Sequence, residues 1–176
     1  MPEGKWLDAN ERQQWLAFIF ATNLLHEQLE RDLQRDAKMP FAYYQLLVVL
    51  SESPGRTQRM SDLADMLLVS RSRLSHAVAR LEDAGWVQRS RCPNDRRGAF
   101  ATLTDDGFAV LEAAAPDHVN SVRTHLFDQL TPEQLEQLRA ISEKLLDHLL
   151  PSLGLESPGM LGLDRPGTET EAAAAR

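Results

Sequence analysis

The sequence predicts a mainly α-helical protein that carries one small β-hairpin. Apolar residues recur at helical spacing over most of the 176 residues. Within residues 86–103 the apolar period changes from 3.6 to 2 on both sides of a turn-forming segment. Helix-capping residues, Pro and Gly separate the periodic segments from one another. Together these three observations indicate several helices and one two-stranded hairpin.

Two helices are predicted before residue 51. Asp8 and Glu11 have the spacing of a capping box, which opens the first helix. This helix is expected to end before Met39-Pro40, because proline does not continue a helix. Residues 41–50 form a second, mostly buried helix that stops at the breaker 51–55. The stripe of the first helix consists of Phe18, Thr22, Leu25, Leu29 and Leu33, preceded by Trp15 and Leu16.

Two short helices are predicted in the middle of the chain, after residues 56–60, which could hold an edge strand. Ser61 is expected to cap the first short helix, and Ser70 caps the second, which Gly85 ends. Two short helices joined by a tight turn have the outline of a helix-turn-helix, although the usual turn glycine is absent.

A hairpin follows, in which residues 86–92 and 99–103 flank a turn at 93–98 made of Pro, Asn, Asp, Arg and Gly. Thr104 is expected to cap a long helix that Pro116 kinks or splits. Thr131 to Gln134 is a capping box that opens the last helix. The apolar stripe of that last helix consists of Leu135, Leu138, Ile141, Leu145 and Leu149.

Charge is distributed unevenly along the chain, whose net charge is −7. Residues 56–97 contain nine arginines and five acids, a net charge of +4, so the remainder carries −11. An acidic body repels phosphate, which confines any contact with nucleic acid to the basic block. A solvated arginine-rich surface is the alternative explanation of this block.

The helix after Ser70 is the candidate nucleic-acid-binding element. Leu74, Ala77, Val78 and Leu81 form its apolar stripe, so small and hydrogen-bonding residues point outward near its N-terminal end. An ordinary amphipathic surface helix is the alternative. We expect contacts to bases or nearby phosphates from Ser72, Arg73, Ser75 and His76, and contacts to phosphates from Arg71 and Arg80.

The hairpin places Arg96 and Arg97 at a protruding tip, where a guanidinium could enter the minor groove. Asp95 could hold one of these arginines in position through a charge-assisted pair. An exposed turn with solubilising charges is the alternative. A basic helix followed at once by a basic hairpin favours a winged helix-turn-helix.

The segments MSDLADMLLVSRSRLSHAVARLEDAGWVQR and PNDRRGAFATLTDDG resemble the multiple-antibiotic-resistance regulator (MarR) family. The resemblance covers roughly residues 10–150. It implies an obligate dimer with interlocking terminal helices, Arg97 in the minor groove with Asp95 as its support, and recognition contacts at residues 71–76. It also implies binding to pseudo-palindromic DNA, frequent repression, and release of DNA by a small aromatic or phenolic molecule.

The resulting organisation has three parts: a helical dimerisation region at 8–38 and 104–150, a winged helix-turn-helix DNA-binding module at 41–103, and a disordered tail at 151–176. Long terminal helices with apolar stripes would be exposed in a monomer, which also favours a homodimer. Double-stranded DNA and a second copy are the expected partners. A winged-helix protein-interaction module and a non-specific architectural DNA binder remain open alternatives.

Other kinds of site have weaker support. A pocket for a small aromatic effector is expected between the DNA-binding module and the dimerisation helices, with plain core residues as the alternative. No phosphate-binding glycine loop or hydrolase motif is present, so we expect no enzyme activity, no cofactor and no metal. The single cysteine, Cys92, and the polar first residues favour a cytoplasmic protein. The candidate effector-binding residues are Trp15, Phe18, His26, Tyr43, Tyr44 and Phe108.

Overall fold

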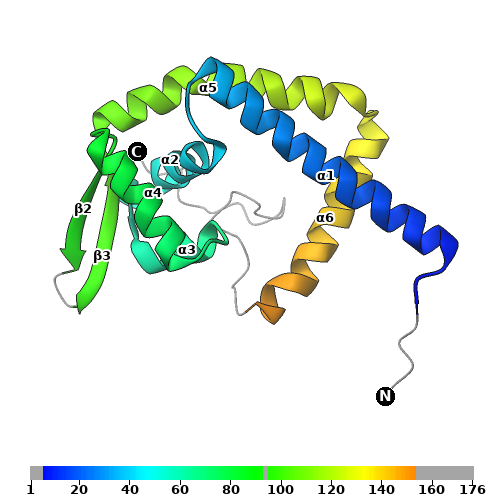
Figure 1. The fold of residues 1–176 in the computed structure, drawn as a ribbon, viewed down its shortest axis with the longest axis horizontal. Coiled ribbons are helices and arrows are strands. Elements are labelled where there is room, and N and C mark those ends of the chain that lie inside the picture. The colour runs from blue at the N-terminus through cyan, green and yellow to red at the C-terminus, as the bar shows by residue number, and fades with distance from the viewer. Residues whose placement is uncertain (1–5, 93–94, 154–176) are drawn as a thin grey trace, which may run out of the picture. The chain divides into compact units, whose positions relative to one another are not determined.

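The computed structural model describes residues 6–92 and 95–153, and of Arg96 and Arg97 it describes the backbone alone. The mainly helical fold class is confirmed, with one small antiparallel sheet. In chain order the elements are α1 (Ala9–Asp36), α2 (Phe41–Glu52), the 3-10 turn η1 (Pro54–Arg56), β1 (Thr57–Arg59), α3 (Met60–Met66), α4 (Arg71–Asp83), β2 (Val87–Cys92), β3 (Asp95–Leu103), α5 (Asp105–His125), the 3-10 turn η2 (Phe127–Gln129) and α6 (Pro132–Ser152) (Figure 1).

The chain divides into two compact units. Among the described residues one unit, here called the helical unit, combines residues 6–41 with residues 113–131. The other, here called the winged unit, combines the described residues of 42–112 with residues 132–153. The proposed assignment of residues 8–38 and 104–150 to one dimerisation region stays a prediction, as does the disordered tail, which from residue 154 lies outside the described residues.

In the helical unit, α1 begins and ends as the sequence predicts. The Asp8 carboxylate accepts hydrogen bonds from two backbone N–H groups, at Asn10 and Glu11, and the Glu11 carboxylate accepts one from the backbone N–H of Asp8, which completes the capping box. Leu29 and Leu33 are buried on the predicted stripe. Further toward the N-terminus the stripe is open to solvent, because about half of the surface of Trp15 and of Phe18 is exposed.

The core of the winged unit is formed by leucine-rich faces of α2, α3 and α4. Of the stripe predicted for the second short helix, Leu74, Val78 and Leu81 are each at most 2% exposed, while Ala77 is half-buried. The largest fully buried side chains of α2 and α3 are Leu46, Leu47, Leu50 and Leu63.

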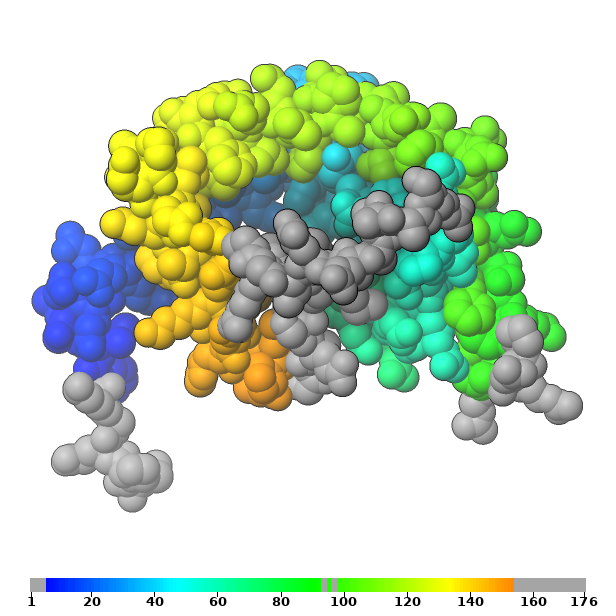
Figure 2. Space-filling model, turned by 180° about the vertical axis from the view of Figure 1, so that it is seen from behind, coloured from blue at the N-terminus to red at the C-terminus, as the bar shows by residue number. Residues whose placement is uncertain are grey.

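Three strands make the sheet, in the order β1-β3-β2 with both pairs antiparallel. The edge strand expected within residues 56–60 is therefore present as β1, which pairs Thr57 with Thr102. Figure 1 shows β2 and β3 extending beside α4, and in Figure 2 the cyan surface near η1 adjoins the green surface of the hairpin.

The start of α3 differs from the prediction that Ser61 is its N-cap. The helix begins at Met60 after Arg59, and the Ser61 hydroxyl donates to the carboxylate of the adjacent Asp62 instead. A serine beside an acid can satisfy its hydroxyl locally, so its presence alone did not fix the helix boundary.

The turn between α3 and α4 works without the expected glycine. Leu68 adopts a positive φ of 54°, the left-handed conformation that glycine normally supplies. The backbone N–H of Leu68 donates to Asp65, and that of Val69 donates to Ala64, which is the hydrogen-bond pattern of a Schellman motif. The motif ends α3 at Met66, and α4 begins at Arg71.

The hairpin turn is shorter than the predicted segment 93–98. β3 already begins at Asp95, which pairs with Cys92, whereas Arg91 pairs with Ala99. The register therefore shifts at Arg91/Cys92, and residues 96–98 form an irregular extra stretch of β3. Pro93 and Asn94 lie outside the described residues.

Pro116 does not split the helix in which it lies, because α5 runs without a break from Asp105 to His125. The predicted cap is present: the backbone N–H of Gly107 donates to the Thr104 hydroxyl at 3.0 Å. α6 begins at Pro132 as expected and has no buried residue over its described length. Among the described helices, none is both long and apolar enough to cross a membrane.

Candidate nucleic-acid interface

Local capping fixes the position of α4, the predicted recognition helix. The Ser70 hydroxyl accepts a hydrogen bond from the backbone N–H of Arg73 at 3.3 Å, as predicted for an N-cap. At the other end Gly85 has a φ of 77°, and the backbone N–H of Trp86 donates to Leu81. A hydrogen bond to a backbone N–H group thus defines the start of α4, and a hydrogen bond between backbone groups defines its end. The set of side chains that α4 exposes is fixed accordingly.

The outward face of α4 carries most of the side chains that the sequence analysis singled out. Ser75 is only half-buried, and its carbonyl accepts a hydrogen bond from the Arg89 guanidinium at 3.3 Å. Its backbone thus takes part in attaching α4 to β2. The exposed candidates are Arg71, Ser72, Arg73, His76 and Arg80.

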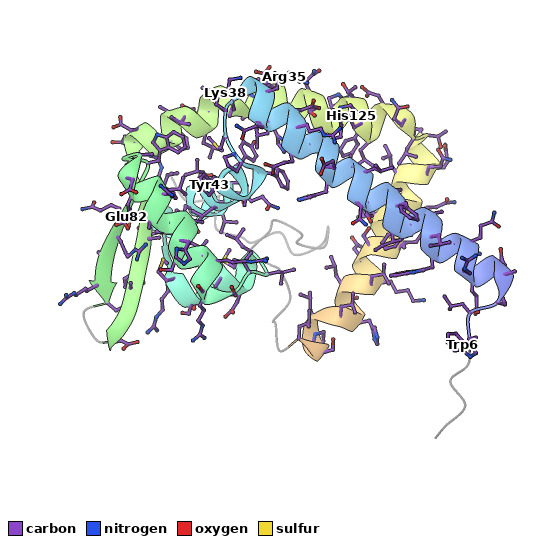
Figure 3. The ribbon with its side chains drawn as sticks, in the orientation of Figure 1. Trp6, Arg35, Lys38, Tyr43, Glu82 and His125 are labelled. Carbon is purple, nitrogen blue, oxygen red and sulfur yellow. The ribbon has the colours of Figure 1, made fainter. Side chains whose placement is uncertain are left out.

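The arginines of α4 differ from other arginines of the winged unit in their electrostatic environment. Arg89 is paired with Glu82 at 3.1 Å, on the side of α4 that faces β2 (Glu82 is labelled in Figure 3). Arg56 is paired with Asp105 at 3.1 Å. By contrast, the three arginines of α4 form no ion pair in the part of the chain that the structure describes, and neither does Arg91 on β2. The three arginines of α4 are Arg71, Arg73 and Arg80.

A role for Asp95 was predicted from the sequence, but its partner Arg59 was not. The Arg59 guanidinium, at the end of β1, donates to the Asp95 carboxylate at the start of β3. Arg59 was counted in the basic block but not named as a site residue, because a contact between residues 36 positions apart has no local signal. The expected contacts of Arg96 and Arg97 involve side chains that lie outside the described residues, so both stay predictions.

The six candidate effector-binding residues are distributed over both units. In the helical unit, Trp15 and Phe18 are exposed and the His26 ring meets Phe41 edge-on at 5.2 Å. In the winged unit, burial raises the pKa of Tyr44, and the Arg56 guanidinium lies 3.8 Å from the centre of the Phe108 ring. Tyr43 is half-buried. None of the six lines either of the two pockets described, and the effector site stays a prediction.

Other site types find little support in the described residues. Within residues 6–92 and 95–153, no three His, Cys, Asp or Glu side chains are grouped so that they could hold a metal ion. His125 instead contacts Asp32, and the His118 ring lies 5.7 Å from the Phe41 ring. Cys92 is a half-buried free thiol at the end of β2.

The solved structures that are similar to this chain include two proteins from Streptomyces coelicolor. Sco3205, a MarR family transcriptional regulator solved in complex with DNA, is 53% identical over 86% of this chain and 95% of its own, with a TM-score of 0.81. AbsC, a MarR family transcriptional regulator, is 43% identical over 82% of this chain and 97% of its own, with a TM-score of 0.77.

Curated proteins match over a shorter region. The transcriptional regulator PecS of Dickeya dadantii is 32% identical over 51% of this chain, and the transcriptional repressor MprA of Escherichia coli is 29% identical over 60% of it. The chain spans 54% and 60% of the lengths of these two relatives. The MarR family model matches residues 37–98, which contain α2 to α4 and most of the hairpin. With two solved relatives above 40% identity along nearly their whole length, the chain belongs to the MarR family of transcriptional regulators.

Proposed function

We propose that this protein regulates transcription by binding a pseudo-palindromic operator in duplex DNA as a homodimer. In this proposal α4 reads base edges in the major groove and the hairpin contacts the minor groove. The protein acts in the cytoplasm as a repressor that releases DNA when a small aromatic effector binds, and it has no catalytic activity. Repression is supported by the likeness to MprA, which is a repressor.

One observation carries the proposal: exposed arginines without ion pairs lie on the outward face of a helix whose opposite face is buried. Arg71, Arg73 and Arg80 have no carboxylate partner among the described residues, so their charge is available to phosphates and bases. Arginines whose only role is solubility can lie on any exposed surface, whereas these lie on the same helix face as Ser72 and His76. The net charge of −7 disfavours a non-specific architectural binder, because the rest of the chain repels DNA.

Exposed apolar side chains support a dimer. On α1, Phe20 and Leu24 are 61% and 68% exposed. On α6, Ile141 and Leu149 are 55% and 48% exposed, at positions that share one helix face. A soluble monomer rarely leaves such stripes in water, and a second copy of the same chain can cover them through a symmetric interface.

The proposal is tested by fluorescence anisotropy with duplex DNA that flanks the protein's own gene, with and without excess random duplex. A specific regulator keeps its complex in the presence of competitor, whereas an architectural binder loses it.

Arg97→Ala should weaken the complex while leaving the dimer intact, and unchanged affinity would show that the assigned wing contact is wrong. Arg31→Ala, which removes a charge from α1, serves as the matched control.

The dimer is tested separately by light scattering of the full chain. Leu145→Glu places a charge on the apolar face of α6 and should convert the dimer to monomer. Lys144→Glu changes a neighbouring residue outside that stripe and should leave the mass unchanged. A wild-type dimer that binds none of the flanking DNA would favour the protein-interaction alternative.

A further inference from the structure

A pocket of about 450 Å³ opens in the winged unit where three segments meet. The junction of β1 and α3 contributes Arg59 and Ser61, and α4 contributes its first residue, Arg71. The start of β3 contributes Asp95 and Gly98. The pocket therefore lies between the N-terminal end of the predicted recognition helix and the turn end of the hairpin. Roles for Arg71 and Asp95 were predicted from the sequence, but none was predicted for Arg59, and no pocket was predicted here.

The lining of this pocket has an excess of positive charge. Arg59 and Arg71 each carry a guanidinium, and Asp95 is the one acid among the lining residues. Asp95 engages the NH2 group of Arg59, which leaves other N–H donors of that guanidinium for a second acceptor. Arg71 has no ion pair in the described residues, so all of its donors are available. The pocket thus offers two sets of cationic donors to an anion.

Gly98 leaves room for the ion pair beside the backbone of β3. A Cβ atom at this position would lie 2.8 Å from the Cys92 sulfur, 2.9 Å from the Arg59 NH2 group and 2.9 Å from the Asp95 carboxylate. Any side chain would therefore require one or more of these side-chain ends to shift, whereas glycine lets them lie close to the backbone of β3.

We propose that this pocket binds one backbone phosphate of the duplex DNA, with Arg59 and Arg71 donating hydrogen bonds to its oxygens. The inference rests on the proposed function and adds a named subsite to it. A phosphodiester fits because it is an anion with several acceptor oxygens, and guanidinium groups match it in geometry. The DNA strand that passes between α4 and the hairpin supplies such a group next to the residues that read bases. Ser61 lines the pocket but donates its hydroxyl to Asp62, so it has no part in this contact.

The first test measures DNA affinity against salt concentration for wild type, Arg59→Gln and Arg71→Gln. Each substitution should weaken binding by roughly tenfold, the usual order for a hydrogen bond to a charged group. Each should also reduce the slope of log affinity against log salt by up to about 0.9, the value for one lost phosphate contact. Arg31→Gln removes the same charge outside the pocket and should leave the slope unchanged. Arg71→Gln breaks no ion pair of the described residues, so it tests the subsite without disturbing the hairpin.

The second test separates a phosphate contact from a purely structural role of the Arg59–Asp95 pair. Single phosphates of the bound duplex are replaced in turn by uncharged methylphosphonates. Wild type should lose most affinity at one particular position, where Arg59→Gln and Arg71→Gln each lose less than wild type because one of the two contacts is already gone. At every other position all three proteins should lose affinity equally. A structural role would instead give the same additional loss at every position.

The outcomes distinguish the subsite from the proposed function. A wild-type protein that binds no duplex would overturn both. A wild-type protein that binds its operator, while both arginine variants keep its salt slope and its full methylphosphonate profile, would overturn the subsite alone. A smaller loss than wild type at one and the same phosphate in both variants would establish the subsite.

Discussion

The hydroxyl of Ser121 on α5 donates a 2.6 Å hydrogen bond to the carboxylate of Asp32 on α1, and both residues are buried. Three further donors reach the same carboxylate: Gln28 at 3.0 Å, Arg35 at 2.7 Å and His125 at 2.9 Å. In Figure 3, Arg35 and His125 mark the α1 and α5 sides of this cluster. Within the helical unit, α1 is thus joined to α5 by a buried charge whose hydrogen bonds are satisfied.

Removing the Ser121 hydroxyl should destabilise the protein. Ser121→Ala deletes a donor to a buried carboxylate, so the free energy of unfolding should fall by about 1–3 kcal/mol in urea titrations. Ser142→Ala, at an exposed position of α6, should change it by less than about 0.5 kcal/mol. Equal effects of the two substitutions would mean that the contact with Asp32 contributes nothing specific.

The same cluster predicts a dependence of stability on pH. The hydrogen bond from Ser121, together with those from His125 and Arg35, lowers the pKa of Asp32 from 3.8 to about 2, although burial acts in the opposite direction. Because the folded-state pKa is the lower one, this stabilisation is complete above pH 4 or so and disappears as the pH falls toward about 2. Asp32→Asn removes the titrating group. The difference in unfolding free energy between wild type and this variant should therefore shrink below about pH 4, and a constant difference would contradict the assignment.

Leu68 should be replaceable by glycine with a gain in stability. Its φ of 54° strains a residue with a Cβ, and its side chain is 65% exposed, so little packing is lost. Relief of the strain exceeds the added flexibility of the unfolded chain, and we expect Leu68→Gly to raise the unfolding free energy by about 0.5–1 kcal/mol. Leu67→Gly is the matched control, because Leu67 has a negative φ of −85° and should lose stability. Thermal and urea unfolding of both variants would decide the sign.

Gly107 should not tolerate alanine, although alanine favours helices. A Cβ at this position would lie 2.1 Å from the backbone carbonyl oxygen of Trp86, which cannot move independently of the chain. The gain of up to about 1 kcal/mol in helix propensity is smaller than the cost of displacing that backbone, so Gly107→Ala should destabilise by at least about 2 kcal/mol. Asp106→Ala, one position earlier and exposed, provides the comparison. An unfolding midpoint at or above that of wild type would refute the close approach.

Arg73 should contribute to the choice of DNA sequence. If it reads a base, Arg73→Ala should weaken operator binding by about 1–3 kcal/mol and relax preference at one position of each half-site. Arg80→Ala removes a charge from the same helix but should weaken all sequences alike, because we assign it a phosphate. Binding to a library of single-base operator variants measures both effects, and an equal loss on every variant with Arg73→Ala would reassign Arg73 to the DNA backbone.

Much of the local structure follows from the sequence by itself. Asp8 with Glu11, Ser70 and Thr104 are side chains that bond to backbone N–H groups within three residues, so their effect on helix starts depends on nearby residues alone. The same holds for the buried face of α4, because 3.6-residue periodicity decides which positions lie together. The basic block at residues 56–97 and the family resemblance were likewise evident from the sequence.

The tertiary structure decided what depends on residues far apart in the chain. Asp32 meets Ser121 across 89 positions, and Arg59 meets Asp95 across 36, so neither pair has a periodic or local signal. The left-handed conformation of Leu68 was not predicted either, since intrinsic preference would place glycine there. Sequence therefore determines where helices start and which faces they bury, because those interactions are short-range. Packing determines which charges are neutralised and which remain available, because that depends on the folded path of the whole chain.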